Sequence, residues 1–95
     1  MTPEGKVKAN IKKILKAHDA YYSMPIGTGF GAMGVPDFLV CHKGRFIGIE
    51  AKTVGNKPTK LQGSNMEHIR SCGGVALVVN ELNLHELEEL LNERT

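Results

Sequence analysis

Asp37, Glu50 and Lys52 are the residues of this chain whose types and spacing suggest a chemical activity. Two carboxylates on adjacent strands can hold a hard divalent cation such as Mg²⁺ and still leave coordination positions for water and a phosphate. A lysine beside them can orient or deprotonate the attacking water, or stabilise the charge that builds up on the phosphate. An aspartate followed by Glu-x-Lys on the next strand therefore indicates metal-assisted hydrolysis of a phosphodiester.

Two predicted strands must position these three residues. Apolar runs at 38–41 and 46–52 flank a polar turn that contains a glycine, which is typical of a β-hairpin. Because side chains alternate along a strand, Glu50 and Lys52 share one face of the second run. If the two runs pair about the turn, Asp37 lies opposite Glu50. Unpaired charges are costly to bury, so we expect these side chains to meet for a functional reason at one end of the hairpin.

The same residues resemble a known nuclease superfamily. Pro36-Asp37, followed on the next predicted strand by Glu50-Ala51-Lys52, is similar to the PD-(D/E)XK signature. The approach Gly31-x-x-Gly34-Val35-Pro36-Asp37, with Gln62 in a following helix, narrows the resemblance to the VRR-NUC branch. That branch includes small stand-alone proteins of viruses and bacteria and domains of larger repair nucleases. The resemblance covers most of the chain, and it implies a restriction-endonuclease-like core with a central mixed β-sheet flanked by helices.

The resemblance also implies roles for individual residues. Asp37 and Glu50 would bind Mg²⁺, with Mn²⁺ as a substitute, together with the backbone carbonyl of Ala51. Lys52 would serve the attacking water. The family has a glutamate near the site in its first helix, and Glu4 resembles it as a residue that completes the outer shell of the metal. The alternative is that Glu4 is a surface acid that complements the helix dipole.

Gln62 has two interpretations. Thr59 and Gln62 have the spacing of a capping box, in which Gln62 reaches back to the backbone amide of the N-cap residue. In the family, the equivalent glutamine points at the active site and positions water or the catalytic lysine. Gln62 shares a helix face with Met66 and Ile69 and so points inward, which favours the second interpretation.

The predicted activity is that of a metal-dependent, structure-selective DNA endonuclease. The chain carries no separate module for reading DNA, so its sequence specificity should be weak. The resemblance implies that four-way Holliday junctions are cut by a homodimer, whose twofold symmetry provides two active sites. The alternatives are a nuclease of flaps or linear DNA, a catalytically inactive DNA-binding module, and a structural protein in which the charges form a salt bridge.

Length and charge agree with such a protein without requiring it. The chain has 95 residues, which predicts one domain over 1–95, and a formal net charge of +2, which permits a nucleic-acid partner. Some lysines are candidates for phosphate contacts, which give salt-dependent and sequence-independent affinity. These candidates are Lys8, Lys12 and Lys16 in the first helix and Lys57 and Lys60 near the second. The alternative is that the helix lysines form an ordinary solvated face.

The order of the predicted elements indicates an α/β sandwich around one mixed sheet. The elements are a helix capped by Thr2, strands at 20–26, 38–41 and 46–52, a helix to about residue 71, a strand at 75–79 and a helix capped by Asn83 with Glu86. The fully apolar run at 75–79 predicts an interior strand.

The glycine-rich stretch 27–34 contains a G-x-G-x-x-G pattern at Gly29, Gly31 and Gly34. Dinucleotide binding requires a helix to begin within such glycines. Pro36 and a strand follow instead, which excludes a nucleotide cofactor. We expect a loop beside the active site, whose glycines either let the backbone approach DNA or serve only the geometry of the loop.

Cysteines, histidines and hydropathy complete the prediction. Cys41 and Cys72 are expected to be free and buried in a protein of a reducing compartment. The four histidines lack the spacing of zinc ligands. No signal peptide or membrane-spanning run is recognisable, so we expect a soluble cytoplasmic protein without a membrane partner, which includes a viral protein acting inside a host cell.

Overall fold

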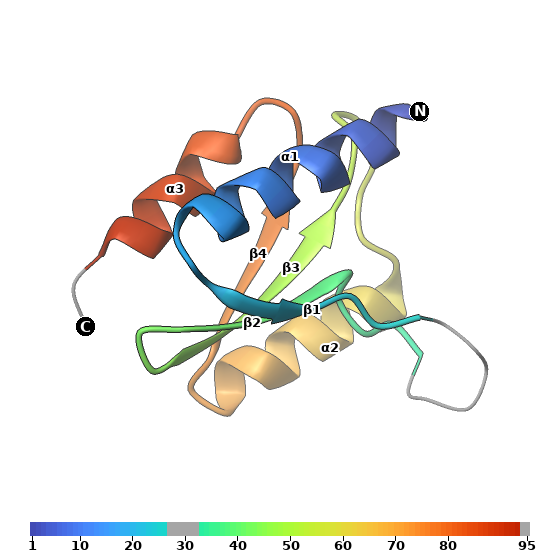
Figure 1. Ribbon diagram of the computed structural model, residues 1–95. Helices are drawn as coiled ribbons and strands as arrows, with labels where there is room; N and C mark the ends of the chain where they lie inside the picture. The colour runs from blue at the N-terminus through green and yellow to red at the C-terminus, as the bar shows by residue number, and fades with distance from the viewer. Residues whose placement is uncertain (27–32, 94–95) are drawn as a thin grey trace.

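A four-stranded mixed β-sheet flanked by three helices forms this α/β protein (Figure 1). The computed structural model describes residues 1–26 and 33–93. The elements are α1 (Pro3–Ala17), β1 (Tyr21–Ser23), β2 (Phe38–His42), β3 (Arg45–Ala51), α2 (Lys60–Ser71), β4 (Val75–Val79) and α3 (Leu84–Asn92). This order and the fold class confirm the prediction, and the arrangement is compatible with a restriction-endonuclease-like core.

The hairpin of β2 and β3 has the predicted register. Its antiparallel pairs run from Phe38 opposite Ile49 to His42 opposite Arg45. Lys43 and Gly44 form the turn with φ values of 50° and 76°. Two successive residues with positive φ give a type I′ turn, whose twist matches that of the flanking strands. The register, continued by one residue beyond β2, brings position 37 opposite position 50.

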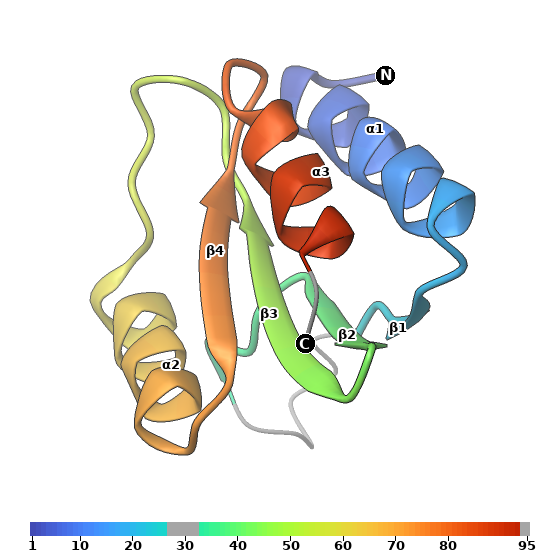
Figure 2. The same cartoon turned by 90° about the vertical axis from the view of Figure 1, so that its left-hand side faces the viewer.

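The sheet order is β1-β2-β3-β4, with β4 parallel to β3. Within the described residues β4 is therefore an edge strand, and the prediction of an interior strand was wrong. Figure 2 shows the reason: α2 lies on one side of the sheet and α1 with α3 on the other. A continuous apolar run indicates that both faces of a strand are covered by other elements. It does not indicate whether the strand has one neighbouring strand or two.

The hydrophobic core lies between the sheet and the α1–α3 layer. Its buried members are Val7, Ile11, Leu15, Phe38, Val40, Ile47, Ile49, Ala51, Val79, Leu87 and Leu91. Helix α1 begins as predicted: the Thr2 hydroxyl accepts a hydrogen bond from the amide of Gly5 at 3.0 Å, and Pro3 occupies the first turn. The buried stripe of α1 fixes the rotation of this helix and hence the direction in which its polar residues point.

Helix α3 begins at the predicted N-cap residue, whose side chain also donates to Glu86 Oε2 at 2.7 Å, but the expected cap of the backbone is missing. Asn83 is its N-cap residue but forms no side-chain cap hydrogen bond. The Asn83 amide instead accepts from the backbone amide of Asn80 at 2.7 Å and donates to the carbonyl of Val78 at 2.9 Å. The Asn83 side chain therefore closes the turn between β4 and α3. Its oxygen already accepts from Asn80 and does not accept from a backbone amide of the helix.

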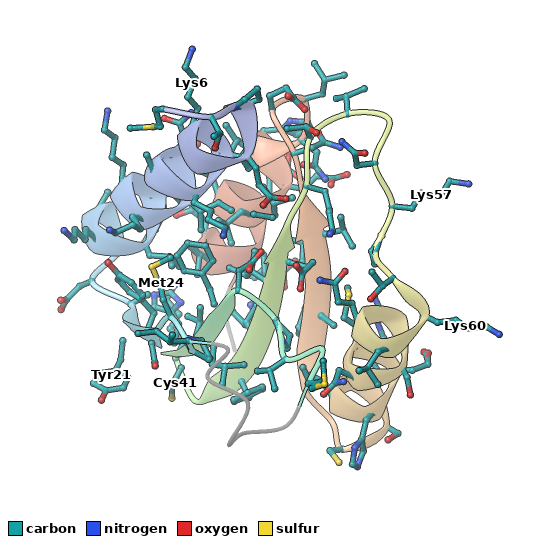
Figure 3. All side chains as sticks on the ribbon, turned by 90° about the vertical axis from the view of Figure 1, so that its right-hand side faces the viewer. Lys6, Tyr21, Met24, Cys41, Lys57 and Lys60 are labelled. Atoms are coloured by element: carbon teal, nitrogen blue, oxygen red, sulfur yellow. The ribbon has the colours of Figure 1, made fainter. Side chains whose placement is uncertain are left out.

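Both cysteines are free, as expected, but both are exposed rather than buried. Cys41 follows Val40 in β2, and the alternation of the strand turns it away from the core. Figure 3 shows Cys41 near the surface, close to Tyr21, with which it pairs in the sheet. Apolar sequence neighbours did not indicate which face of the sheet the thiol would occupy.

The first strand is shorter than predicted, and part of the predicted glycine-rich loop is not described by the structure. The first strand covers only Tyr21–Ser23 of the predicted range 20–26. Gly29 and Gly31 of the glycine-rich loop lie outside the described residues. None of the helices within residues 1–26 and 33–93 combines the length and the apolar character that crossing a membrane requires.

Candidate active site

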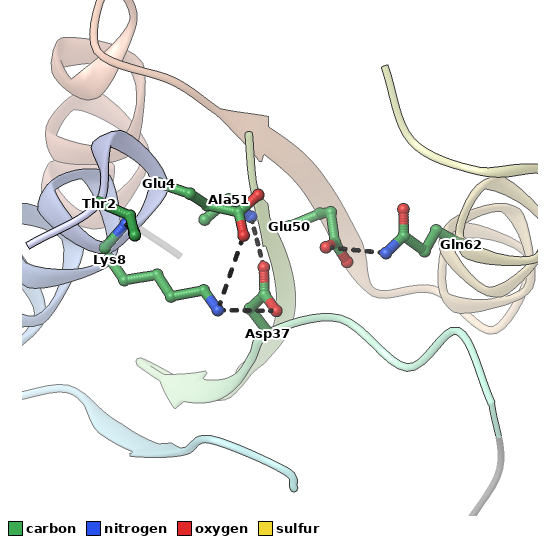
Figure 4. Close-up of polar contacts among 8 residues, drawn as sticks. Thr2, Glu4, Lys8, Asp37, Glu50, Ala51 and Gln62 are labelled. Carbon is green, nitrogen blue, oxygen red and sulfur yellow. Dashed lines mark hydrogen bonds and ion pairs between the residues drawn. The ribbon is translucent and has the colours of Figure 1, made fainter. Parts of the chain in front are cut away.

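The predicted site residues come together where β2 begins and β3 ends. Asp37 immediately precedes β2, and Glu50 and Ala51 are the last two residues of β3. The Asp37 Oδ2 atom accepts a hydrogen bond from the backbone amide of Ala51 at 2.9 Å. Since this amide belongs to the neighbouring strand, the backbone of β3 itself fixes the Asp37 carboxylate at the end of the hairpin (Figure 4).

Glu50 is the buried acid of the site, with only 2% of its surface exposed. Its Oε1 atom accepts a hydrogen bond from Gln62 Nε2 at 3.2 Å. Its Oε2 atom is buried and has no hydrogen-bond partner among the described residues. A buried carboxylate oxygen without a donor is costly, so this atom marks a place where a proton or a cation is needed.

The pKa of Glu50 reports the same imbalance. Burial, and then the neighbouring Asp37 carboxyl, raise the pKa of Glu50 to about 8. The positive charge of Lys52 lowers this pKa, and the negative charge of Glu4 raises it further. When Glu50 is protonated it can donate to Asp37, but when it is ionised two negative groups face each other. Asp37 and Glu50 therefore share a proton when no cation is present to balance their charge.

The carbonyl of Ala51 faces the same region. Within a strand, the N–H and C=O groups of one residue point to the same neighbouring strand. The Ala51 amide points to Asp37, whereas the amide of Lys52 donates to the Val79 carbonyl on the opposite side at 2.9 Å. The Ala51 carbonyl is thus directed past the end of β2, on the side of the two carboxyl groups.

Gln62 forms the predicted capping box and also contacts Glu50. Its Oε1 atom accepts from the Thr59 amide at 2.9 Å, and its own amide donates to Thr59 Oγ1 at 3.2 Å, which completes the capping box. Its Nε2 atom is then free to donate to Glu50. Because the oxygen must face an N–H group and the nitrogen must face a carboxylate, the hydrogen bonds settle the orientation of the amide. The capping box of Thr59 and Gln62 therefore positions Gln62 Nε2 to donate to Glu50.

Two glycines allow α2 to lie close enough for this contact. A Cβ atom on Gly48 of β3 would lie 2.6 Å from Ile69 Cδ1, and one on Gly34 would lie 2.7 Å from Leu61 Cγ. Gly34 also has a φ of +77°, which disfavours other residues. Gly34 therefore lets the chain before Asp37 pack against α2.

Glu4 and Lys8 reach the site from the first two turns of α1. Lys8 Nζ lies 4.0 Å from Glu4 Oε2 and 3.7 Å from Asp37 Oδ1 (Figure 4). Lys8 was predicted to lie with Lys12 and Lys16 on a face directed toward DNA. The structure instead directs its ammonium to a carboxylate of the site, while Lys12 and Lys16 are exposed. The i,i+4 spacing of Glu4 and Lys8 was the sequence signal for their contact.

Lys52 lines a shallow polar hollow beside the carboxyl groups. The hollow has a volume of about 520 Å³ and is lined by Thr2, Pro3, Glu4, Lys52, Thr53, Asn56 and Lys57. The salt bridges formed by the described residues do not include Lys52. Lys57 and Lys60 extend away from the body of the protein in Figure 3. The hollow therefore places Lys52 at the edge of the acidic site, while Lys57 borders the hollow from its outer side.

The donors of the site fit a hard cation. Carboxylate and carbonyl oxygens are the ligands that Mg²⁺ prefers, and it commonly takes one or two carboxylates and completes its shell with waters and phosphate oxygens. Asp37, Glu50 and the Ala51 carbonyl supply that set, and the unpartnered Glu50 Oε2 would gain a ligand. No cluster of three or more His, Cys, Asp or Glu side chains with metal-binding geometry occurs in ranges 1–26 and 33–93, so waters and substrate would have to complete the shell.

Comparisons of the sequence with known proteins identify no relative. No protein-family model matches this chain, and no curated protein matches it either. A functional conclusion therefore depends on the residues and the geometry of this site.

Proposed function

We propose that this protein is a metal-dependent DNA endonuclease of the VRR-NUC branch of the PD-(D/E)XK nucleases, which hydrolyses phosphodiester bonds inside the cell. The observation that carries the proposal is the buried Glu50 carboxyl, which has one unpartnered oxygen and faces Asp37. Two carboxyl groups that repel each other when both are ionised contribute nothing to the stability of the hairpin end unless a proton or a cation balances them. A nuclease gains a cation site there.

In this proposal Asp37, Glu50 and the Ala51 carbonyl hold Mg²⁺, or Mn²⁺ in its place. Bound Mg²⁺ would neutralise the charge that develops on the phosphate and activate a water for in-line attack. Gln62 keeps the Glu50 carboxylate oriented through its Nε2 donor, and Glu4 accepts hydrogen bonds from waters at the open side of the site.

Lys52 has two functions in the proposed reaction. Lys52 directly follows β3 and its charge acts on Glu50, so its ammonium can orient the attacking water and stabilise the negative charge of the phosphate. The polar hollow that it lines has room for a phosphate beside the site, and Lys57 borders the same hollow. Lys57 and Lys60, with the exposed Lys12 and Lys16, would bind the adjacent DNA backbone.

The proposed substrate is a four-way DNA junction, cut by a homodimer. One small domain supplies one site, and two strands of a symmetric junction require two sites related by a twofold axis. The four-stranded sheet and three helices include no separate element for reading bases, which supports selection by DNA shape rather than by sequence.

The test is a cleavage assay with an immobile four-way junction, a flap and a linear duplex, each with Mg²⁺, Mn²⁺ or EDTA. Wild type should cut the junction in symmetric pairs with either metal and not in EDTA. Lys52→Ala should cut roughly 100-fold more slowly, because it loses acid–base and charge stabilisation, yet bind the junction normally. Lys13→Ala, which changes another exposed lysine, is the matched control and should cut like wild type.

The outcomes separate the alternatives. Binding of junctions without cutting in either metal would show a DNA-binding module and reject the nuclease. Faster cutting of the flap or the linear duplex would retain the nuclease and reject the junction as its substrate. The molar mass of the same sample should be twice that of one chain, and a monomer with paired cuts would contradict the dimer.

A further inference from the structure

Lys8 occupies a position that neither the motif nor the resemblance assigns to a residue. Helix α1 carries Glu4 and Lys8 on one face, one turn apart, and the buried stripe of the helix turns this face toward the sheet end. From there Lys8 Nζ approaches Asp37 Oδ1 to 3.7 Å and Glu4 Oε2 to 4.0 Å. The side chain is only 34% exposed, which is low for a helix-surface lysine. Its ammonium thus lies against two acids of the site, Asp37 and Glu4.

The Asp37 carboxylate has little room for a second cation. Its Oδ2 atom is engaged by the Ala51 amide, and its Oδ1 atom faces Lys8. A metal bound to either oxygen would lie within a few ångströms of the Lys8 ammonium. Like charges at such distances repel strongly where part of the surrounding water is excluded. The metal and Lys8 would therefore compete for the same acid.

We propose that Lys8 is a built-in counter-ion of the site, which balances Asp37 and Glu4 while no metal is bound and must move away when a divalent cation binds. Lys8 is then a positioning residue that sets the affinity for the metal. This inference depends on the proposed nuclease function only in taking Asp37 as a metal ligand. A flexible four-carbon side chain on a helix surface can leave the carboxylate without any change in the fold.

The experiment compares Mn²⁺ binding by wild type, Lys8→Met, Lys8→Arg and Lys6→Met, measured by isothermal titration calorimetry without DNA. Lys8→Met keeps the aliphatic length of the side chain and removes its charge. Lys6→Met makes the same charge change two residues away in the same helix, where Lys6 extends into solvent (Figure 3). Lys8→Arg keeps the charge.

Lys8→Met should bind Mn²⁺ roughly tenfold more tightly than wild type, because a partly exposed competing charge has been removed. Lys6→Met should differ from wild type by less than about twofold, since exposed charges at longer range are screened. Lys8→Arg should remain close to wild type. A Lys8→Met variant that binds Mn²⁺ while wild type does not would support the proposal in its strongest form.

Other results would overturn it. Equal affinities of Lys8→Met and wild type, or equal gains from Lys6→Met and Lys8→Met, would show that Lys8 is no specific competitor. If wild type binds Mn²⁺ and cuts DNA but Lys8→Met changes nothing, only this inference is lost. If neither wild type nor Lys8→Met binds Mn²⁺, the metal site fails as well, and both proposals are rejected together.

Discussion

The two ends of the β2–β3 hairpin both gather charged side chains, but they do so in opposite ways. At the turn end, Lys43 Nζ donates to the Leu91 carbonyl at 3.1 Å. Arg45 donates to the Leu90 carbonyl at 2.7 Å and forms an ion pair with Glu93 at 3.0 Å. Cations there meet the carbonyl groups at the C-terminal end of α3, where the helix dipole favours positive charge.

At the other end, two carboxyl groups are held together. Asp37 and Glu50 repel each other when both are ionised, and Glu50 Oε2 has no partner among the described residues. The turn end also has buried nitrogens without partners, Nδ1 of His42 and Nε of Arg45. The Arg45 guanidinium nevertheless reaches two acceptors through its other nitrogens, so its net interaction is attractive. The difference indicates that the turn end stabilises the fold and that the open end is arranged for a ligand.

The largest expected effect comes from Glu50→Gln, which removes the repulsion at the open end. The folded protein binds a proton at Glu50 with a pKa of about 8 against 4.5 for the ordinary group. Because the folded pKa is the higher one, ionisation destabilises the fold, and the cost accumulates as the pH rises from about 4.5 to 8. In EDTA at pH 8, Glu50→Gln should therefore be more stable than wild type by about 4 kcal/mol, while its cutting is abolished.

Denaturant unfolding at several pH values measures this difference. The gain should shrink toward zero below pH 4.5, where Glu50 becomes protonated in the unfolded state as well. Glu88→Gln, on the exposed side of α3, is the control and should show no such pH window. A Glu50→Gln variant that is less stable than wild type at pH 8 would contradict the claim that ionised Glu50 destabilises the fold at the open end of the hairpin.

A smaller effect is expected from Gln62→Glu, which distinguishes the role of Gln62 in capping α2 from its contact with Glu50. Glutamate at this position of a capping box still accepts from the Thr59 amide, so α2 should remain intact. The donor to Glu50 is replaced by a third negative charge, so cutting should fall roughly tenfold through the lost orientation of Glu50. Circular dichroism would check the helix and a junction assay the rate; unchanged cutting would show that Gln62 serves only the helix.

The smallest effect is expected at the turn end. Arg45→Met should lower the free energy of unfolding by about 1 kcal/mol, because it removes an ion pair and a carbonyl contact that are partly exposed. It should leave the cutting rate unchanged, since the residue lies at the far end of the hairpin. A loss of cutting without a loss of stability would remove the distinction between the two ends.

Some features could be predicted because they depend on neighbours along the chain. The Lys43-Gly44 turn and the alternation in 38–41 and 46–52 fixed the register, and the register makes Asp37 the neighbour of Glu50. The capping box of α2 likewise depends on Thr59 and Gln62 alone.

Other features could not be predicted because they depend on packing between distant segments. β4 is an edge strand, and its sequence shows only that helices cover both of its faces. Cys41 is exposed because it lies on the sheet face away from the core, where α2 packs on β3 and β4. Lys8 faces Asp37 because the core residues of α1 set the rotation of that helix against the sheet. The donor that Gln62 offers to Glu50 depends on how closely Gly48 lets α2 approach β3.

The sequence by itself determined the hairpin, its register and hence the pairing of two acids, because turn geometry and strand alternation act over a few neighbouring residues. Only the tertiary structure decided that one acid is buried with an oxygen that has no partner within residues 1–26 and 33–93, and that a lysine from α1 lies beside the other. Burial and charge balance are sums over side chains that the fold brings together from distant parts of the chain.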